Sequence, residues 1–366
     1  MQAVIDSLIH RAIAGQVFPG AVVLVAREGA RLHHAAYGAT MYAAPGSRPL
    51  TPDDIFDIAS LTKVFTASAA LALYDAGALD LEAPARRYLP RLRAEQVLVR
   101  HLLTHTSGLE ARLSVLRTLG PEGIRAAVYG AAPARPPGSV VAYTNINSFL
   151  LGEVVSALAG MPLDAAIRRL ILEPLGMRET GFCPPPELRA RIPPTEVEPD
   201  WRGLVHGVVH DESAYALGGV AGHAGLFSTA SDLERLLRMW LQGGAWEGRQ
   251  VLREATVAAA LRDYTGALPA LSGASTRTGL GWMLDRANFM GAAPAGSFGH
   301  TGFTGPAIVG VPAQGLAFVL LSNRTYPRRT PPPYRHHAVT AAVLEAARIY
   351  PNRPETYSSV RLSLGF

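Results

Sequence analysis

The chain has 366 residues, 48% hydrophobic and 17% charged, a balance typical of a globular protein with one large domain or two ordinary ones. Its net charge of +5 comes from scattered arginines, which indicates a basic solvated surface and excludes the clustered pattern of a nucleic-acid partner. One cysteine, Cys183, excludes an internal disulfide framework, and no apolar run approaches the roughly 18 residues of a membrane span.

The first elements along the chain are a helix and a hairpin. Residues 1–15 (MQAVIDSLIHRAIAG) carry apolar side chains at helical spacing, interrupted by charged ones, which predicts an amphipathic helix and not a signal peptide. We therefore expect a cytoplasmic protein. Residues 20–38 contain two β-rich runs on either side of Glu28 and Gly29, which predicts a hairpin.

A long helical region follows, because strand signals nearly vanish until about residue 278. Helices are predicted at 61–77, 99–105, 146–160, 162–172 and 230–244. Strands return at 278–285, 298–312 and 316–324, and residues 334–350 predict a closing helix.

This order of elements predicts an α+β fold. Strands from both ends of the chain would form one antiparallel sheet, covered by the N- and C-terminal helices, with a large mainly helical domain inserted between them. We assign residues 1–58 and 275–350 to the sheet domain, 59–274 to the helical domain and 351–366 to a C-terminal tail.

Lys63 is the only lysine in a chain with 33 arginines. It lies in the stretch SLTK (60–63), where Ser60 precedes a predicted helix and Lys63 falls in its first turn. Residues three apart on a helix share a face, so the amine can reach the hydroxyl. An arginine keeps its proton in proteins, whereas a desolvated lysine can release it and act as a base toward a serine nucleophile.

Two further short motifs carry side chains suited to the same chemistry. Tyr143 and Asn145 follow a proline-glycine turn and precede a helix, where a phenol and an amide can share protons and orient a carbonyl. His300, Thr301 and Gly302 lie in a late strand, next to glycines that permit close approach to the backbone.

In this order, S-x-x-K, Y-x-N and a basic residue followed by Thr-Gly resemble the serine β-lactamase and penicillin-binding-protein superfamily. The chain most resembles the branch of class C β-lactamases, D,D-carboxypeptidases and β-lactamase-like esterases. Further similar segments are LLTHTSGL (102–109), PPGSVVAYTN (136–145), EPLGM (173–177), ALGGVAGHAGLFSTASDL (216–233) and GLGW (279–282). The resemblance implies a helical domain packed against an antiparallel sheet.

The resemblance also implies a role for each matching residue. Ser60 would be the acylated nucleophile, Lys63 its proton acceptor, and Tyr143 the shared base that activates the deacylating water. Asn145 would be the orienting amide, and the oxyanion hole would consist of the backbone N–H groups of Ser60 and Phe303.

His300 departs from the family pattern. β-Lactamases of this type usually place a lysine there, whose charge meets the substrate carboxylate, whereas a histidine is mostly neutral at pH 7. We therefore expect a hydrolase that acts through an acyl-enzyme on a small ester or amide, as an esterase or D-amino-acid peptidase, with weak β-lactamase activity at best. No cofactor and no metal are expected, and the expected partner is the small-molecule substrate.

Two alternatives remain open from the sequence. One is a sensor or binding protein that is acylated on Ser60 without turnover. The other is a zinc hydrolase, because pairs of histidines four residues apart can chelate zinc. The residues available for it are His101, His105, His206, His210, Asp211 and His223. The sequence does not predict the substrate, the oligomeric state or the course of the loops at 183–215 and 262–278.

Overall fold

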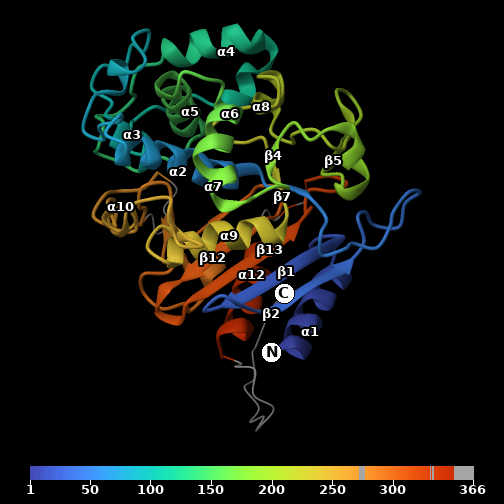
Figure 1. Cartoon of the computed structure of the whole chain (residues 1–366). Helices are drawn as coiled ribbons and strands as arrows, with labels where there is room; N and C mark the ends of the chain where they lie inside the picture. The colour runs from blue at the N-terminus through green and yellow to red at the C-terminus, as the bar shows by residue number, and fades with distance from the viewer. Residues whose placement is uncertain (272–276, 330, 332–333, 350–366) are drawn as a thin grey trace.

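In the computed structural model, residues 1–271, 277–329, 331 and 334–349 are described, and the predicted tail 351–366 lies outside them. An antiparallel sheet carries helices on both faces, and a mainly helical region lies above one of these faces (Figure 1). The predicted α+β class is therefore confirmed.

The main sheet combines strands from both ends of the chain. Within the described residues it has six strands in the order β10-β11-β12-β13-β1-β2, and every neighbouring pair is antiparallel. The early hairpin joins the late strands through β1 and β13, where Ala21 faces Ser322 and Val25 faces Phe318. The strands are β1 (Gly20–Arg27), β2 (Ala30–Gly38), β10 (Met283–Leu284), β11 (Phe298–Thr301), β12 (Ala307–Val311) and β13 (Leu316–Ser322).

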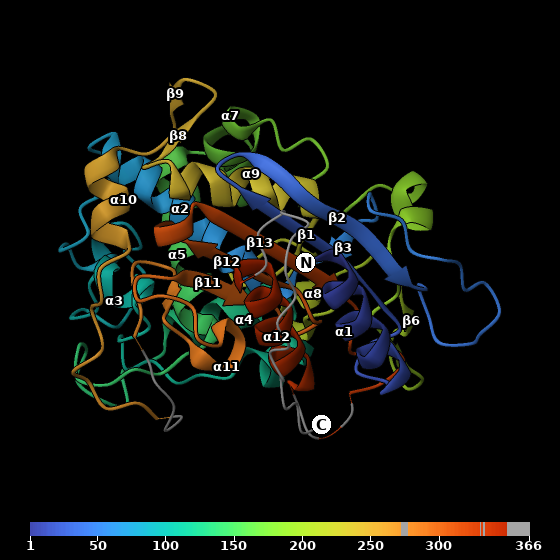
Figure 2. The same cartoon turned by 90° about the horizontal axis from the view of Figure 1, so that it is seen from below.

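Both faces of the central strands are buried, which explains why β1 is a continuous apolar run. Alternate side chains enter different cores: Val22 and Leu24 belong to the core under α9 (Ala230–Leu241), whereas Val23 and Val25 belong to the opposite one. That second core is covered by α1 (Gln2–Ala14) and α12 (Arg335–Ile349), which lie side by side under the sheet (Figure 2).

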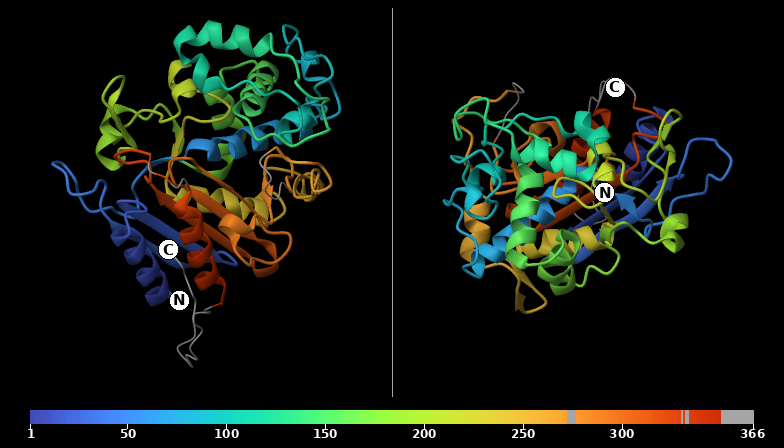
Figure 3. Two further views of the ribbon diagram at one scale, coloured as in Figure 1. Left: turned by 180° about the vertical axis from the view of Figure 1, so that it is seen from behind. Right: turned by 90° about the horizontal axis from the view of Figure 1, so that it is seen from above.

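The helical region is built around two packed helices, α2 (Thr62–Asp75) and α5 (Asn145–Ala159). Figure 3 shows this region from behind and from above. The other helices are α3 (Val99–Leu103), α4 (Gly120–Tyr129), α6 (Leu163–Ile167), α7 (Glu173–Leu175), α8 (Glu212–Ala216), α10 (Glu254–Ala260) and α11 (Ala287–Met290). Short 3₁₀ segments are η1 (Ala59–Leu61), η2 (Ala85–Arg87), η3 (Leu113–Leu119), η5 (Pro186–Arg191) and η6 (Pro312–Gln314), and η4 (Arg168–Leu172) is a π-helical segment between α6 and α7.

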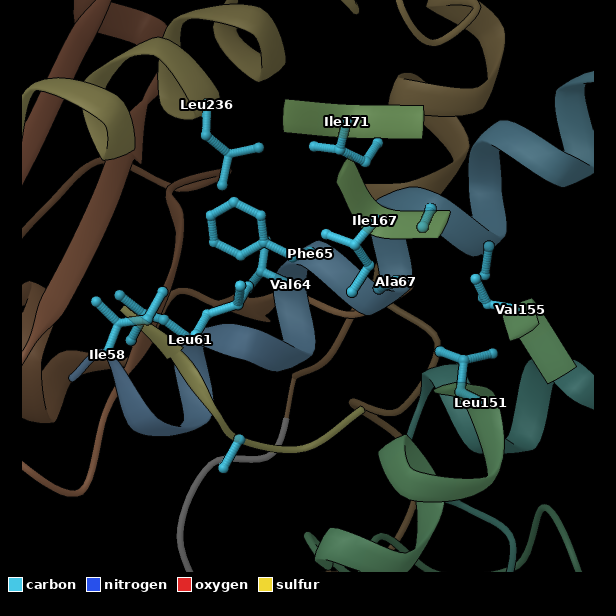
Figure 4. Packing of buried hydrophobic residues seen from close by; sticks show 14 of the residues in the cluster. Ile58, Leu61, Val64, Phe65, Ala67, Leu151, Val155, Ile167, Ile171 and Leu236 are labelled. Atoms are coloured by element: carbon cyan, nitrogen blue, oxygen red, sulfur yellow. The ribbon is translucent and has the colours of Figure 1, made fainter. Parts of the chain in front are cut away.

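One fully buried side chain links α2 to its neighbours on both sides. The ring of Phe65 points toward Leu236 of α9, with Ile167 and Ile171 alongside (Figure 4). The helix that begins next to Ser60 is therefore fixed in one large core with α9, the helix that covers the sheet.

The long helices predicted from the sequence are confirmed within a few residues of their bounds, but the strand predictions are less accurate. The stretch 278–285 contains only the two-residue β10, and 298–312 is two strands separated by a turn at Gly302–Pro306. Several short strands in the helical region were not predicted, because two or three residues carry too little periodicity. They are β3 (Phe56–Asp57), β4 (Gly181–Phe182), β5 (Glu196–Glu198), β6 (Gly203–Val205), β7 (Leu226–Ser228), β8 (Ala245–Trp246) and β9 (Arg249–Gln250).

As for membrane spans, no single helix among the described residues has both the length and the apolar composition required. The bent pair formed by Asn145–Ala159 and Leu163–Leu175 meets the length and composition criteria only when its two parts are taken together.

Candidate active site

Ser60 lies on a strained turn between β3 and α2. Ala59 adopts a φ of +46°, in the left-handed region that residues with a Cβ rarely occupy. The buried carboxylate of Asp57 holds the turn, because it accepts hydrogen bonds from the N–H of Ala59 (2.8 Å) and the N–H of His210 (2.6 Å). The turn places the Ser60 side chain in the cleft, next to the N-terminus of α2.

The Lys63 amine contacts the Ser60 hydroxyl directly. Its Nζ donates to Ser60 Oγ at 2.8 Å and to the carbonyl oxygen of His223 at 3.1 Å. The side chain is 3% exposed, and no carboxylate among the described residues forms an ion pair with it. Burial lowers the pKa of Lys63 to about 7, and the charge of Asp211 only partly opposes this. A large fraction of the amine is therefore uncharged at neutral pH.

Tyr143 lies beside this pair and is exposed to the cleft over 46% of its surface. Its ring centroid is 5.1 Å from Lys63 Nζ, 4.7 Å from the ring of His105 and 5.9 Å from the ring of His300. Partial removal of the phenol from water raises the pKa of Tyr143 above its usual value, although a hydrogen bond with the Ser60 hydroxyl lowers it. The phenol therefore keeps its proton at neutral pH.

Asn145 begins α5 and faces the same cleft. Its Nδ2 lies 3.4 Å from Oδ2 of Asp211, a long hydrogen bond. The Y-x-N motif thus places a phenol and an amide in the lining of one cavity together with Ser60.

His300 and Thr301 end β11 and also line the cleft. Burial and the nearby Lys63 lower the pKa of His300 to about 3, and its Nδ1 lies 3.0 Å from the carbonyl oxygen of Thr301. This histidine is therefore neutral at pH 7, as expected from the sequence. It supplies no fixed charge for a substrate carboxylate.

Gly302 allows the end of β11 to approach the Ser60 turn. A Cβ at this position would lie 2.7 Å from the carbonyl oxygen of Ile58 and 3.4 Å from Cβ of Ala59. From the sequence we expect the glycines here to let a substrate approach the backbone, but in the structure the close neighbour of Gly302 is the backbone before Ser60.

Two backbone N–H groups beside the cleft have no acceptor within the described part of the chain. Among the described residues, the N–H groups of Ser60 and Phe303 donate no hydrogen bond, whereas that of Gly302 donates to Pro306 (2.7 Å). Unoccupied donors beside a nucleophile can stabilise negative charge on a carbonyl oxygen.

A cleft of about 740 Å³ connects these residues. Its lining comes from η1, the start of α5, the N-terminal side of α8, β11 and the segment 281–289. All the predicted site residues except the buried Lys63 line it. Lys63 reaches the cleft through its contact with Ser60.

The histidines that the sequence offers as zinc ligands contact different partners. His101 Nδ1 accepts the N–H of Leu98, His206 lies 2.9 Å from the carbonyl of Arg189, and His210 pairs with Glu196 at 2.7 Å. Among the described residues, no group of three His, Cys, Asp or Glu side chains is arranged to hold a metal ion. The alternative of a histidine-ligated zinc site thus has no ligand set in the described part of the chain.

The charged residues that line the cleft are Asp211, Glu212, Arg286 and Arg329, and the sequence predicts none of them as a catalytic or substrate-binding residue. The sequence indicates Asp211 only as a possible zinc ligand and gives no indication of Arg286. Arg286 donates to Thr278 Oγ1 at 3.1 Å, but its Nε is buried without a partner, and no carboxylate among the described residues pairs with it. Neither residue belongs to a short motif, so no spacing in the sequence could have identified them.

The sequence model of the Beta-lactamase family matches residues 5–342. A putative D-alanyl-D-alanine carboxypeptidase from Salmonella schwarzengrund (strain CVM19633) is 28% identical over 352 residues, covering 85% of this chain and 78% of the relative. EstCE1, described as a hydrolase with promiscuous acyltransferase activity, has a similar structure, with a TM-score of 0.74, 22% identity and coverage of 94% of this chain and 98% of its own. A class C β-lactamase in complex with cefoxitin gives a TM-score of 0.74 at 21% identity, with the same coverage.

The chain therefore belongs to the Beta-lactamase family and is a serine hydrolase by type. The resemblance identified in the sequence and the fold that it implied are both confirmed. The substrate and the steps of the reaction are inferred from the site itself.

Proposed function

We propose that the protein hydrolyses a small ester or amide through an acyl-enzyme on Ser60. The observation that carries this proposal is the 2.8 Å contact between Ser60 Oγ and the buried Lys63 amine, whose pKa of about 7 leaves it free to accept a proton. A base is most effective when its pKa lies near the working pH.

In the acylation step, the Ser60 hydroxyl proton passes to Lys63 while Oγ bonds to the substrate carbonyl carbon. The N–H groups of Ser60 and Phe303 stabilise the negative oxygen that forms. The C–O or C–N bond then breaks, and the leaving group departs with the proton that Lys63 returns. The products are an ester on Ser60 and a free alcohol or amine.

Water resolves this ester. As a proton leaves the water for the Tyr143 oxygen, the phenol's own proton passes to Lys63, so Tyr143 is protonated both before and after the step. The hydroxide equivalent bonds to the acyl carbon, the bond to Ser60 Oγ breaks, and the serine recovers its proton. Asn145 orients the acyl group at the edge of the cleft.

Arg286 favours a second candidate substrate, an amide with a free carboxylate. His300 is neutral, whereas Arg286 is a cation in the cleft with an unsatisfied Nε. A guanidinium is well suited to bind a carboxylate through two hydrogen bonds. The carboxypeptidase relative is named for D-alanyl-D-alanine, a peptide that ends in a carboxylate.

The test compares a nitrophenyl ester, a D-alanyl-D-alanine peptide and a chromogenic cephalosporin as substrates of the wild type and of Ser60→Ala. We expect turnover of the ester, slow turnover of the cephalosporin, and a loss of at least about 1000-fold in the variant. If Ser60→Ala turns over the ester as fast as the wild type does, the proposal is contradicted. Turnover of the cephalosporin as fast as that of the ester contradicts the substrate assignment.

The variant Arg286→Gln separates the two candidate substrates. If the carboxylate is bound by Arg286, KM for the peptide rises by about tenfold or more, because the charge-assisted pair is lost, while the neutral ester is unaffected. An equal loss on both substrates would indicate a structural role for Arg286.

A further inference from the structure

Asp211 is an ionised carboxylate at the edge of the cleft that the proposed reaction does not use. As the residue before α8, it accepts hydrogen bonds at Oδ1 from Ser213 Oγ (2.6 Å), the N–H of Ala214 (2.9 Å) and His223 Nε2 (3.2 Å). Burial favours its neutral form, but His223 and these donors outweigh burial and hold the pKa of Asp211 well below its usual range.

The backbone of the same histidine contacts Lys63. The carbonyl oxygen of His223 accepts the hydrogen bond from Lys63 Nζ at 3.1 Å, while its ring pairs with Asp211. His223 is fully buried, so its contacts with the Asp211 carboxylate and the Lys63 amine are shielded from water.

The negative charge of Asp211 raises the pKa of Lys63, against the larger effect of burial. Besides the Asp211 and His223 pair, three titratable groups face the amine from other elements: Tyr143 from the segment before α5, His105 from the segment after α3, and His300 from β11. Burial lowers the pKa of both His105 and His300 to about 3, and the phenol of Tyr143 keeps its proton. None of these three carries charge at neutral pH.

We propose that Asp211 and His223 form a positioning pair for Lys63. The carboxylate raises the proton affinity of the buried amine, and the His223 carbonyl directs the amine toward Ser60. This inference rests on the proposed function, in which Lys63 takes the Ser60 proton. Without the carboxylate, the desolvated amine would be a weaker base than the reaction requires.

The single lysine makes a direct test possible. In protein labelled with ¹³C at lysine Cε, Lys63 gives the only side-chain signal, and its titration midpoint can be followed by NMR between pH 4 and 10. We expect the midpoint to fall by about one pH unit or more in Asp211→Asn, which removes the charge and keeps an acceptor at Oδ1. The control is Glu212→Gln, an adjacent acid whose carboxylate pairs with Arg329 at 2.7 Å, and its midpoint should stay at the wild-type value.

The acid limb of the pH profile of kcat/KM should move by the same amount as the midpoint, which a merely structural role would not produce. An unchanged or higher midpoint in a folded Asp211→Asn protein overturns the inference. If that variant does not fold, Asp211→Ser replaces it, since serine also caps a helix without carrying charge. The titration is independent of turnover, so failure of the proposed function would appear in Ser60→Ala and not in this measurement.

Discussion

Lys63 is buried beside Tyr143, His105 and His300, three groups that carry no charge at neutral pH. At the scale of single residues, its loss of charge follows from burial, since moving an ammonium group out of water favours the neutral amine. A guanidinium in the same place would keep its proton. This difference accounts for one lysine in a chain that otherwise uses arginine.

Lys63→Arg tests that account. We expect kcat for a nitrophenyl ester to fall by about 100- to 10000-fold, the range typical of a lost general base. Steady-state kinetics give the loss, and thermal unfolding shows whether the larger side chain is accommodated. A folded variant that keeps kcat within tenfold of the wild type would exclude Lys63 as the base.

The pH dependence provides a second test at this scale. The amine must be neutral to act, and its pKa is about 7, so kcat/KM for an uncharged ester should rise with pH and level off above about pH 8. His105 and His300, with pKa values of about 3, should add no step between pH 5 and 9. A profile that is flat across that range, or falls with pH, is incompatible with this assignment.

Single site residues differ in how far the sequence could predict them. Ser60, Lys63 and Tyr143 belong to short motifs whose chemistry depends on residue type and local spacing, and the structure brings them together. Arg286 and Asp211 reach the cleft only through the path of the chain between elements. No local sequence pattern predicts how the chain runs between these elements.

At the scale of elements, the site depends on the contact between β11 and the Ser60 turn. Gly302 lies against the backbone of Ile58, and Asp57 anchors the turn from the other side. Ser60 and the proposed oxyanion donors are therefore held by two elements that can approach this closely only because residue 302 has no side chain.

Gly302→Ala should push these two elements apart. Its Cβ would meet the Ile58 carbonyl oxygen at 2.7 Å, so we expect kcat to fall by at least about tenfold and the free energy of unfolding to fall by about 1–3 kcal/mol. The matched control is Gly181→Ala, where nothing lies within 4 Å of an added Cβ. Comparable activity of the two variants would show that the contact does not hold the site.

The longest elements were the easiest to predict, although the ten-residue helix α4 was missed. α1, α2, α5 and α12 repeat an apolar pattern over several turns, and the hairpin carries a clear turn at Glu28 and Gly29. The short strands β3 and β7 do not, because their pairing beside Ser60 is set by the packing around them.

At the scale of the whole molecule, the sheet separates two cores, and α2, which begins next to Ser60, belongs to the larger one. Phe65 of α2 is fully buried between α9 and the helices around Ile167. Because α9 also packs on the sheet, the position of Ser60 depends on the packing of that sheet.

Phe65→Ala should therefore lower the free energy of unfolding by about 3–5 kcal/mol, through lost burial and the cavity left behind. Tyr74→Ala, at the other end of the same helix and 40% exposed, should cost less than about 1 kcal/mol. Chemical denaturation gives both values. Equal losses would mean that α2 is not held through Phe65.

The overall fold was predictable because strands at both ends of the chain and helices between them leave few arrangements with one sheet. The shape of the cleft was not. It depends on segments such as 183–215 and 281–289, whose course follows from contacts such as Arg202 with Glu198 rather than from periodicity.

The most direct measurement of the central claim is the intact mass of the protein during turnover of a nitrophenyl ester, followed by peptide mapping. The account predicts a transient mass increase equal to the acyl group, located on the peptide that contains Ser60 and absent in Ser60→Ala. A stable adduct without turnover would instead identify an acylated sensor. Full turnover by Ser60→Ala, or an adduct at another residue, would contradict the account.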